Sequence, residues 1–570
     1  MLIISLHARL VLLRNEEDLD EMMQLFHVAV NNKQVKTPDR FDMSCRWAQL
    51  ARCFGRPCTS TAYDCAISLM RDTLTFTPTL YTQHSQLAAV PNDHRVLPLD
   101  YASHLAQTGR FDQAIEILEQ GRALLWSEMR GLRTSMDQLR AAHSQLADKL
   151  AVVNRDLEEL TLTDSNTNGD GGDGLEGMDH IGLLLLKQRK LLYDRSKLIS
   201  QVRSLPGFES FLKAPSFDTL ISAASRGPVI VINHSEWRSD TFILLHNAPP
   251  SVIPTSDDFY DSATKLRDRL TICRIEHGID SKQYERVLCS VLGGLSDLVG
   301  RPVIENLQSL NVPEQSRVWW CPTSVFCSLP LHAMGPIPSG DGTKRYFFDI
   351  YIPSYTPSLS ALIQSRKHGE QSFAKPSILL VAQPDQSLLS AIPEISAIKR
   401  LDTKVTALVS NKATPSGVLE SLQDHQFSHF ACHGKLEDGK PFEASFQLHN
   451  GKRLTLLDLI RSQLPSAEFA FLSACHTAEL TEGSIADEAL HLTAAMQHCG
   501  FRSVVGTMWG MADDDGPELV KYFYKSMFSR KQEGIPYYER SARALRDAVR
   551  RLRKNRVPLE RWVNFVHYGA

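Results

Sequence analysis

Two short apolar stretches of the chain end in the same pair of reactive residue types. FSHFACHG ends in Cys432, His433 and Gly434, and FAFLSACHT runs into Cys475 and His476. A thiolate and an imidazole can bind a metal ion, can act as nucleophile and base, or can simply lie hydrogen-bonded in a core. Taken singly, each pair leaves all three possibilities open.

A metal site built from both pairs conflicts with strand geometry. Neighbouring residues on a strand point to opposite faces, so Cys432 and His433 are poorly placed to ligate one ion. The close ligand spacing of structural zinc sites is also absent. A structural role suits Cys432, Cys499 and His429, because cysteine is among the most buried residue types and a strand histidine is often hydrogen-bonded in the core. We expect neither a metal nor a cofactor.

Combining His433 with Cys475 gives an arrangement that can hydrolyse an acyl bond. The thiol reacts as a thiolate, and a nearby imidazole can take its proton and later return it to the leaving group. His433 precedes Cys475 by 42 residues, close to the roughly 50-residue spacing of caspases. If the two stretches are adjacent parallel strands, their carboxyl ends meet. Gly434 would then let a substrate backbone approach closely.

The elements that must position these residues are visible from about residue 228 onward. Short apolar runs bounded by Gly, Pro, Asn or charged residues alternate with helical patterns, which predicts an α/β fold with a mostly parallel sheet covered on both faces. Chemistry in such sheets gathers at the carboxyl ends of strands. His433 and Cys475 are expected at the last residues of two of them. The predicted strands are 228–235, 241–247, 317–322, 377–383, 427–434, 443–449, 469–475 and 503–509.

The first two hundred residues are predicted to be helical. RWAQLARCFGR (46–56) and DYASHLAQTGRFDQAIEILEQGRAL (100–124) share a pattern whose small-large-Gly-Ala order is typical of a tetratricopeptide (TPR) helix pair. They lie 54 residues apart, where such a repeat has about 34. The sequence therefore indicates degenerate repeats over residues 1–126, with a generic helical bundle as the alternative.

A helical hairpin is expected over residues 127–213. Apolar residues from Leu132 to Leu160, interrupted by His143, recur at spacings of three and four, which predicts a seam on one long helix. A second helix runs up to Leu205. Between them, residues 163–179 have almost no apolar side chains and predict a flexible acidic loop.

This acidic loop begins like a calcium-binding EF-hand loop. Asp164, Asn166, Asn168 and Gly169 occupy its positions 1, 3, 5 and 6. The bidentate acid belongs at position 12, where this chain has Leu175. Because that ligand closes the coordination shell, its absence argues against a calcium site and leaves calcium binding only as a minor alternative.

Composition excludes several classes of function. The 62 Lys+Arg and 65 Asp+Glu residues nearly balance, so no electrostatic footprint for nucleic acid exists. No uncharged apolar run of about 18 residues is present, which predicts no membrane span. The opening residues 1–13 are interpreted as a helix rather than a signal peptide. Eleven scattered cysteines without a C-x-x-C pair favour reduced thiols and a cytoplasmic location.

From these residues the chain resembles the CHAT domain, a caspase-like (clan CD) cysteine peptidase module commonly preceded by tetratricopeptide repeats. The segments EILEQGRALLW (116–126) and GFESFL (207–212) resemble those that precede the domain in fungal members. The resemblance implies that residues 214–570 form the peptidase domain. It rests on HFACHG at 429–434, FLSACHTAE at 471–479, LPLHAMG at 329–335, SYTPSLSAL at 354–362, and residues 487–524 and 562–569.

The resemblance also implies roles for single residues. Cys475 would be the nucleophile and His433 the general base, with backbone N–H groups of Cys475 and Gly434 holding the oxyanion. In metacaspases and clostripain-like relatives an aspartate two residues before the nucleophile pairs with a basic P1 side chain, whereas this chain has Ser473. Asp487 or the cluster around Asp514 could supply the acid instead. Further candidates are Trp509, as a pocket wall or a buried aromatic, and His476, beside the site without being the base.

The sequence thus predicts a cytoplasmic cysteine endopeptidase that cleaves protein or peptide substrates, with a protein partner or activator bound by the helical N-terminal region. We expect no nucleic-acid and no membrane partner. The alternative is a catalytically silent CHAT-fold scaffold or TPR interaction module. A third reading is another enzyme or a calcium-responsive module.

Overall fold

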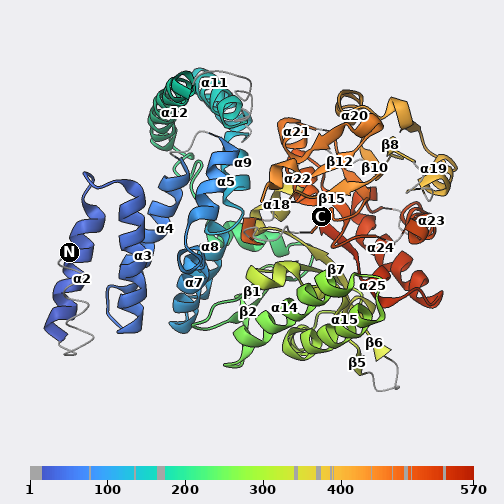
Figure 1. The fold of residues 1–570 in the computed structure, drawn as a ribbon. Helices are drawn as coiled ribbons and strands as arrows, with labels where there is room; N and C mark the ends of the chain where they lie inside the picture. Colours follow the sequence, from blue (N-terminus) through green and yellow to red (C-terminus); the bar gives the residue numbers. More distant parts are fainter. Residues whose placement is uncertain are drawn as a thin grey trace. The chain divides into compact units, whose positions relative to one another are not determined.

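The chain divides into two compact units, Met1–Ala214 and Pro215–Ala570 (Figure 1). The expected helix over residues 1–13 and the EF-hand-like positions 164–169 lie outside the described residues. The computed structural model describes residues 16–75, 79–133, 136–162, 174–338, 344–367, 374–384, 388, 391–437, 439–464, 466–479, 486–488, 491–511, 513–529 and 534–570.

The first unit consists of helices that pack mainly in sequential pairs, as the apolar periodicity predicts. Helices α3 and α4 contact each other, as do α7 and α8. The bounds are α2 (Glu16–Asn31), α3 (Thr37–Cys53), α4 (Thr59–Thr75), α5 (Leu80–Ala89), α6 (Asn92–Arg95), α7 (Leu97–Gln107), α8 (Phe111–Gln120) and α9 (Leu124–Leu132).

The two predicted repeat segments end their first helices in the same way. Gly55 after α3 and Gly109 after α7 both have positive φ angles, 60° and 76°. The residue after each glycine donates its N–H to a carbonyl five residues earlier, Arg56 at 2.8 Å and Arg110 at 2.9 Å. This is the glycine cap that lets a helix end in a tight turn. The 54-residue offset seen in the sequence is therefore an offset between structurally equivalent turns.

The prediction of one long helix over residues 132–160 is wrong, because α9 ends at Leu132 and the rest of the range contains two further helices. The chain breaks at His143, where φ is −144° and ψ is 72°, so α10 (Asp137–Ala142) and α11 (Ser144–Thr161) are separate. His143 is also the residue that interrupts the apolar seam. Helix α12 (Gly174–Arg203) packs along α11. It includes residues 174–179, for which the sequence predicts a loop.

The second unit is built on an 11-stranded sheet with the order β3-β2-β1-β4-β7-β16-β15-β14-β10-β8-β9. Strands β15, β14, β10, β8 and β9 run parallel to one another, and the antiparallel pair β15 and β16 joins them to a second parallel block, β16, β7, β4 and β1. The mixed α/β class with a mostly parallel sheet is confirmed. The bounds are β1 (Val229–Asn233), β2 (Asp240–Leu244), β3 (Ser251–Pro254), β4 (Arg317–Cys321), β7 (Ile352–Tyr355), β8 (Ile378–Ala382), β9 (Val405–Val409), β10 (Phe427–Ala431), β14 (Phe469–Ser473), β15 (Ser503–Thr507) and β16 (Phe565–Gly569).

One predicted strand does not belong to this sheet. The apolar run 443–449 forms β12 (Ser445–Gln447), which pairs antiparallel with β11 (Gly434–Lys435) and β13 (Arg453–Thr455) in a three-stranded sheet. A short apolar run predicts a strand but carries no information about its partner. This small sheet follows directly from β10.

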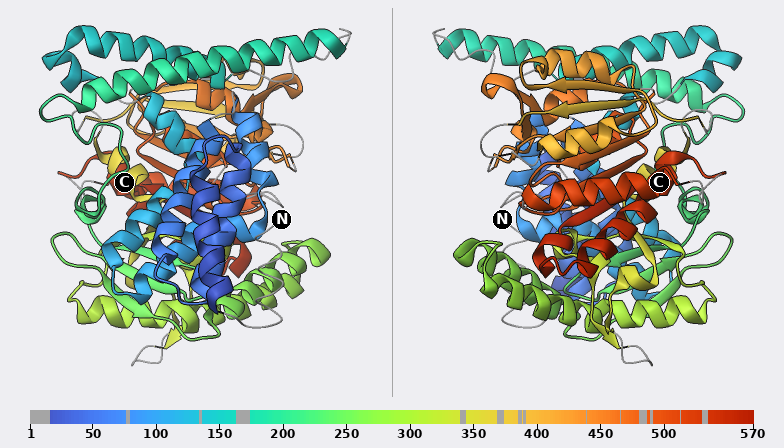
Figure 2. Two further views of the ribbon diagram at one scale, coloured as in Figure 1. Left: turned by 90° about the vertical axis from the view of Figure 1, so that its left-hand side faces the viewer. Right: turned by 90° about the vertical axis from the view of Figure 1, so that its right-hand side faces the viewer.

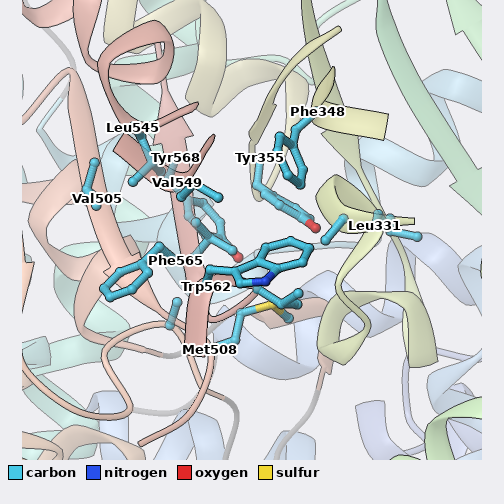
Figure 3. Packing of buried hydrophobic residues seen from close by; sticks show 14 of the residues in the cluster. Leu331, Phe348, Tyr355, Val505, Met508, Leu545, Val549, Trp562, Phe565 and Tyr568 are labelled. Atoms are coloured by element: carbon cyan, nitrogen blue, oxygen red, sulfur yellow. The ribbon is translucent and has the colours of Figure 1, made fainter. Parts of the chain in front are cut away.

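Helices cover both faces of the large sheet. On one face α24 (Tyr537–Lys554) contacts β7, β15 and β16 and packs beside α23 (Gly516–Met527), as the red helices of Figure 2 show. On the other, α18 (Leu359–Lys367) and α22 (Leu492–Cys499) contact β16. Aromatic and aliphatic side chains fill the core between the layers, among them Trp562, Tyr568 and Phe348 (Figure 3).

Among the described residues one helical stretch, Lys282–Ser309, has the length and apolar composition that a membrane span requires. Half of its most apolar window is buried inside the structure. It comprises α15 (Lys282–Leu295), a π-helical turn and α16 (Arg301–Ser309), and Leu288 and Leu292 pack in the core of the second unit. Burial of this apolar face in protein accounts for its hydropathy.

A buried histidine in this core makes stability depend on pH. His332 lies between the Tyr355 hydroxyl, 3.0 Å from Nδ1, and the Val563 carbonyl, 2.8 Å from Nε2. Burial lowers the pKa of His332 to about 4, whereas an unfolded histidine has a pKa of about 6.5. The unfolded state therefore binds the proton first. We expect the contribution of His332 to stability to be full above pH 6.5 and to fall by about 3 kcal/mol as the pH drops to 4.

Urea denaturation at a series of pH values measures this loss. The variant His332→Gln is expected to show a flatter pH dependence than wild type, although it is less stable at neutral pH. The exposed His277 offers a matched control, and His277→Gln should keep the wild-type dependence. Equal slopes for His332→Gln and wild type would contradict the prediction.

Candidate active site

Strands β10 and β14 are adjacent and parallel, and they bring the two Cys-His segments together. Their register pairs Phe427 with Phe469 and Ala431 with Ser473. The chain leaves both strands at the same level, and His433 and Cys475 each follow two residues later. Both therefore lie just beyond the strand ends, not on the last strand residues as the sequence predicted. Each side chain is half-buried.

The backbone of Gly434 lies directly against the backbone of Cys475. A Cβ atom added to Gly434 would lie 2.1 Å from the Cys475 carbonyl oxygen and 3.5 Å from its nitrogen. No side chain fits in that space, so glycine is required by a close approach of two chain segments rather than by a special φ angle. The segments that carry the candidate base and the candidate nucleophile are thereby in contact.

The turn that carries Cys475 is held by the end of β15. The Thr507 hydroxyl donates to the Ala474 carbonyl at 2.7 Å, and His476, with a φ of 62°, donates its N–H to the Trp509 carbonyl at 3.3 Å. The N–H of Met511 points at the Cys475 sulfur, 3.2 Å away. This donor favours negative charge on the sulfur, which is the form that reacts, whereas the Met511 carbonyl oxygen, 3.8 Å away, accepts from the protonated thiol.

His433 is held by the small sheet. Its carbonyl accepts a hydrogen bond from the Gln447 N–H at 2.8 Å, and the next residue, Gly434, pairs with Phe446 across β11 and β12. The run at 443–449 therefore positions the histidine instead of extending the main sheet.

Beneath the strand ends lies a buried polar network that sequence reasoning missed. Glu394 on α19 (Ala391–Lys399) is 2 % exposed. One of its carboxylate oxygens accepts from the Ser473 hydroxyl at 3.1 Å, and the other lies 3.2 Å from Nε2 of His429. Nδ1 of His429 contacts the Tyr524 hydroxyl at 3.2 Å. The available signal in the sequence is a single charged residue, Glu394, inside the mostly apolar pattern AIPEISAI.

The comparison that decides the family is a match to a family model. Residues 290–570 match the model of the CHAT domain. These residues form a CHAT domain. The CHAT domain predicted from HFACHG and FLSACHTAE is thus confirmed over residues 290–570, and both segments lie inside this range. A comparison with curated proteins finds no match.

Crystal structures of a separase–securin complex and of a gingipain are among the solved structures similar to the chain. A Saccharomyces cerevisiae separase–securin complex aligns over 100 % of this chain with 10 % identity and a TM-score of 0.42, and a second crystal structure of that complex aligns over 89 % with 10 % identity and a TM-score of 0.38. The chain spans about half the length of the first matched chain, 47 %, and 37 % of the second. The Porphyromonas gingivalis Arg-specific proteinase gingipain R (RgpB) aligns over 48 % of this chain and 68 % of its own, with 10 % identity and a TM-score of 0.32.

Ser473 does not face an open pocket in the CHAT domain. It is 2 % exposed, and its hydroxyl donates a hydrogen bond to the Glu394 carboxylate. A carboxylate therefore lies next to Ser473, but Glu394 on α19 supplies it rather than the strand residue itself. The residues of strand β14 give no indication that the acid next to Ser473 is Glu394 of a distant helix.

The other predicted pocket residues have different surroundings. Asp487 accepts a hydrogen bond from the backbone N–H of Ser324 at 3.0 Å and so holds the segment that contains Ser324. Asp514 is exposed, while its neighbour Asp515 is buried and paired with Arg561 at 2.5 and 2.7 Å.

Trp509 and His476 do lie beside the Cys475 turn. Trp509 is buried, donates its indole N–H to the Glu560 carbonyl at 3.0 Å, and lines a cavity of about 30 Å³. Nδ1 of His476 pairs with Glu479, whose other oxygen lies 2.9 Å from Arg274 on α14 (Phe259–His277). His476 is thus engaged with a carboxylate.

The neighbouring cysteine is not placed to react. Cys432 is 1 % exposed, and burial raises the pKa of its thiol far above the usual range. Within the described part of the chain, no group of three or more His, Cys, Asp or Glu side chains is arranged to hold a metal ion. All eleven cysteines are thiols rather than disulfides.

Proposed function

We propose that the chain is a cytoplasmic cysteine endopeptidase with Cys475 as nucleophile and His433 as base. The observation that carries this proposal is the contact between the Gly434 and Cys475 backbones at the carboxyl ends of two adjacent parallel strands. This contact places an imidazole and a thiol on two segments that meet, inside a CHAT domain.

In the proposed reaction the Cys475 sulfur attacks the scissile carbonyl while His433 accepts the thiol proton. The oxyanion is held by the N–H groups of Cys475 and Gly434, and removal of such a donor typically costs about 10²–10³ in rate. His433 then returns the proton to the leaving amine. Water, deprotonated by the same imidazole, hydrolyses the acyl-enzyme.

The helical unit would bind a protein partner or activator. A cavity of about 390 Å³ lies among α4, α7 and α8 and is lined by charged and polar side chains of both signs, including Asp64, Arg71, Tyr101, Arg110 and Glu116. Such a lining favours a polar peptide segment over an apolar ligand. The equivalent glycine turns of the two helix pairs support a repeat surface for such a segment.

Labelling by a biotinylated peptidyl electrophile tests the proposal. We expect wild type to be labelled at Cys475, Cys475→Ala to lose the label entirely, and the matched control Cys432→Ala to keep it, because Cys432 is buried. Cleavage of a peptide library by wild type and its loss in Cys475→Ala would complete the test. Labelling that persists in Cys475→Ala overturns the nucleophile. If wild type is neither labelled nor able to cleave any peptide, the peptidase proposal is overturned and the catalytically silent scaffold is the remaining hypothesis.

A further inference from the structure

The second unit contains a cluster of arginines that the proposed peptidase does not use. We call Arg226, Arg317, Arg366 and Arg543 the arginine cluster; they come from the turn before β1, the start of β4, α18 and α24. The guanidinium groups of Arg317 and Arg366 lie 4.5 and 4.6 Å from the ring centroid of the buried Trp319. Stacking on an indole holds two cations in place.

The cluster has far more positive than negative charge. The strongest charges acting on Arg317 are the three other arginines and one carboxylate, Glu539. Glu539 pairs with Arg226, while Arg317 reaches only the backbone carbonyl of Glu539, at 3.3 Å. Burial, followed by the neighbouring arginines, lowers the pKa of Arg317 to about 9, and that of Arg366 is lowered to about 10 by burial and Arg226.

Several donors of these arginines are unused within the described residues. Arg317 donates one Nη to the Ser354 hydroxyl at 2.8 Å, and Arg366 donates one to the Ala223 carbonyl at 2.5 Å. However, Nε of Arg317 and both Nε and the second Nη of Arg366 are buried without a hydrogen-bond partner. A buried charged donor without an acceptor is costly. The cluster therefore lacks acceptors as well as negative charge.

We propose that the arginine cluster is a binding site for a multiply charged phosphate anion. Guanidinium forks match the oxygens of phosphate bidentately. A polyphosphate brings both the negative charge and the acceptors that a single carboxylate cannot supply. The first turn of the 18-residue helix α24, which contains Glu539, lies at the cluster, and its N-terminus adds favourable potential for an anion. Glu539 then acts as an internal competitor for the arginines.

Inorganic pyrophosphate is the probe for this site. We expect pyrophosphate to raise the melting temperature of the full chain and to bind measurably by calorimetry, more strongly than inorganic phosphate. Sodium chloride at equal ionic strength controls for screening. The variant Arg366→Gln is expected to weaken binding roughly tenfold or more, since one charge-assisted pair contributes on the order of a tenfold change in affinity. The matched control Arg301→Gln, at an exposed arginine paired with Asp297, should bind like wild type.

A second variant keeps the proposal testable if Arg366→Gln does not fold. Glu539→Gln removes the competing carboxylate and is expected to strengthen pyrophosphate binding, a change that misfolding cannot imitate. If pyrophosphate raises the melting temperature of wild type no more than sodium chloride of equal ionic strength does, the proposal is overturned. Equal weakening in Arg301→Gln and Arg366→Gln, or unchanged binding in a folded Glu539→Gln, overturns it as well.

Discussion

Replacing Gly434 by alanine is expected to lower the rate of Cys475 labelling about 100-fold while the protein stays folded. The added Cβ atom would lie 2.1 Å from the Cys475 carbonyl oxygen, so one of the two segments must move away by about an ångström. A displacement of that size between reacting groups can cost on the order of 10² in rate. Labelling kinetics with the peptidyl electrophile and a thermal melt of the same sample measure both quantities.

A glycine in open space provides the control. Gly293 lies in α15, and a Cβ atom there meets nothing within 4 Å. Gly293→Ala should label like wild type and gain roughly 0.5–1 kcal/mol of stability, because alanine loses less conformational freedom than glycine in a helix. If Gly434→Ala labels as fast as Gly293→Ala, the contact between the two segments is not needed for reactivity.

Replacing Glu394 by alanine is expected to cost about 2–6 kcal/mol of folding free energy, because it leaves the buried polar groups of His429 and Ser473 without their partner, at about 1–3 kcal/mol each. Glu394 is buried and contacts both His429 and Ser473. It joins α19 to the strand end that leads into Cys475, so the labelling rate should fall as well. Urea denaturation gives the free energy of unfolding for the variant and wild type.

An exposed ion pair in the same unit is the appropriate comparison. Glu437 lies 2.8 Å from Lys435 and 3.0 Å from Arg453 near the surface. Such pairs contribute about 0–1 kcal/mol, so Glu437→Ala should unfold almost like wild type. A loss below about 1 kcal/mol for Glu394→Ala would mean that the Glu394 network contributes no more than this surface pair.

The sequence by itself determined much of the second unit. Seven of its eight predicted apolar runs are strands of the large sheet, because continuous burial on both faces leaves a run of apolar residues that is legible without a structure. The motifs around His433 and Cys475 were enough to predict the CHAT domain that the family match confirms. In the first unit, the sequence showed the 54-residue spacing of two similar segments, and the structure showed that each contains an equivalent turn, at Gly55 and Gly109.

Contacts between distant segments were decided only by the tertiary structure. Nothing near Ser473 in the sequence indicates that its hydroxyl donates a hydrogen bond to Glu394, 79 residues away. Nothing near Trp319 indicates that arginines from separate elements stack on its ring. The run at 443–449 likewise became a support for His433 instead of a central strand. Periodicity records which side of an element is buried, whereas the partner of a buried polar group depends on which elements the fold places beside it.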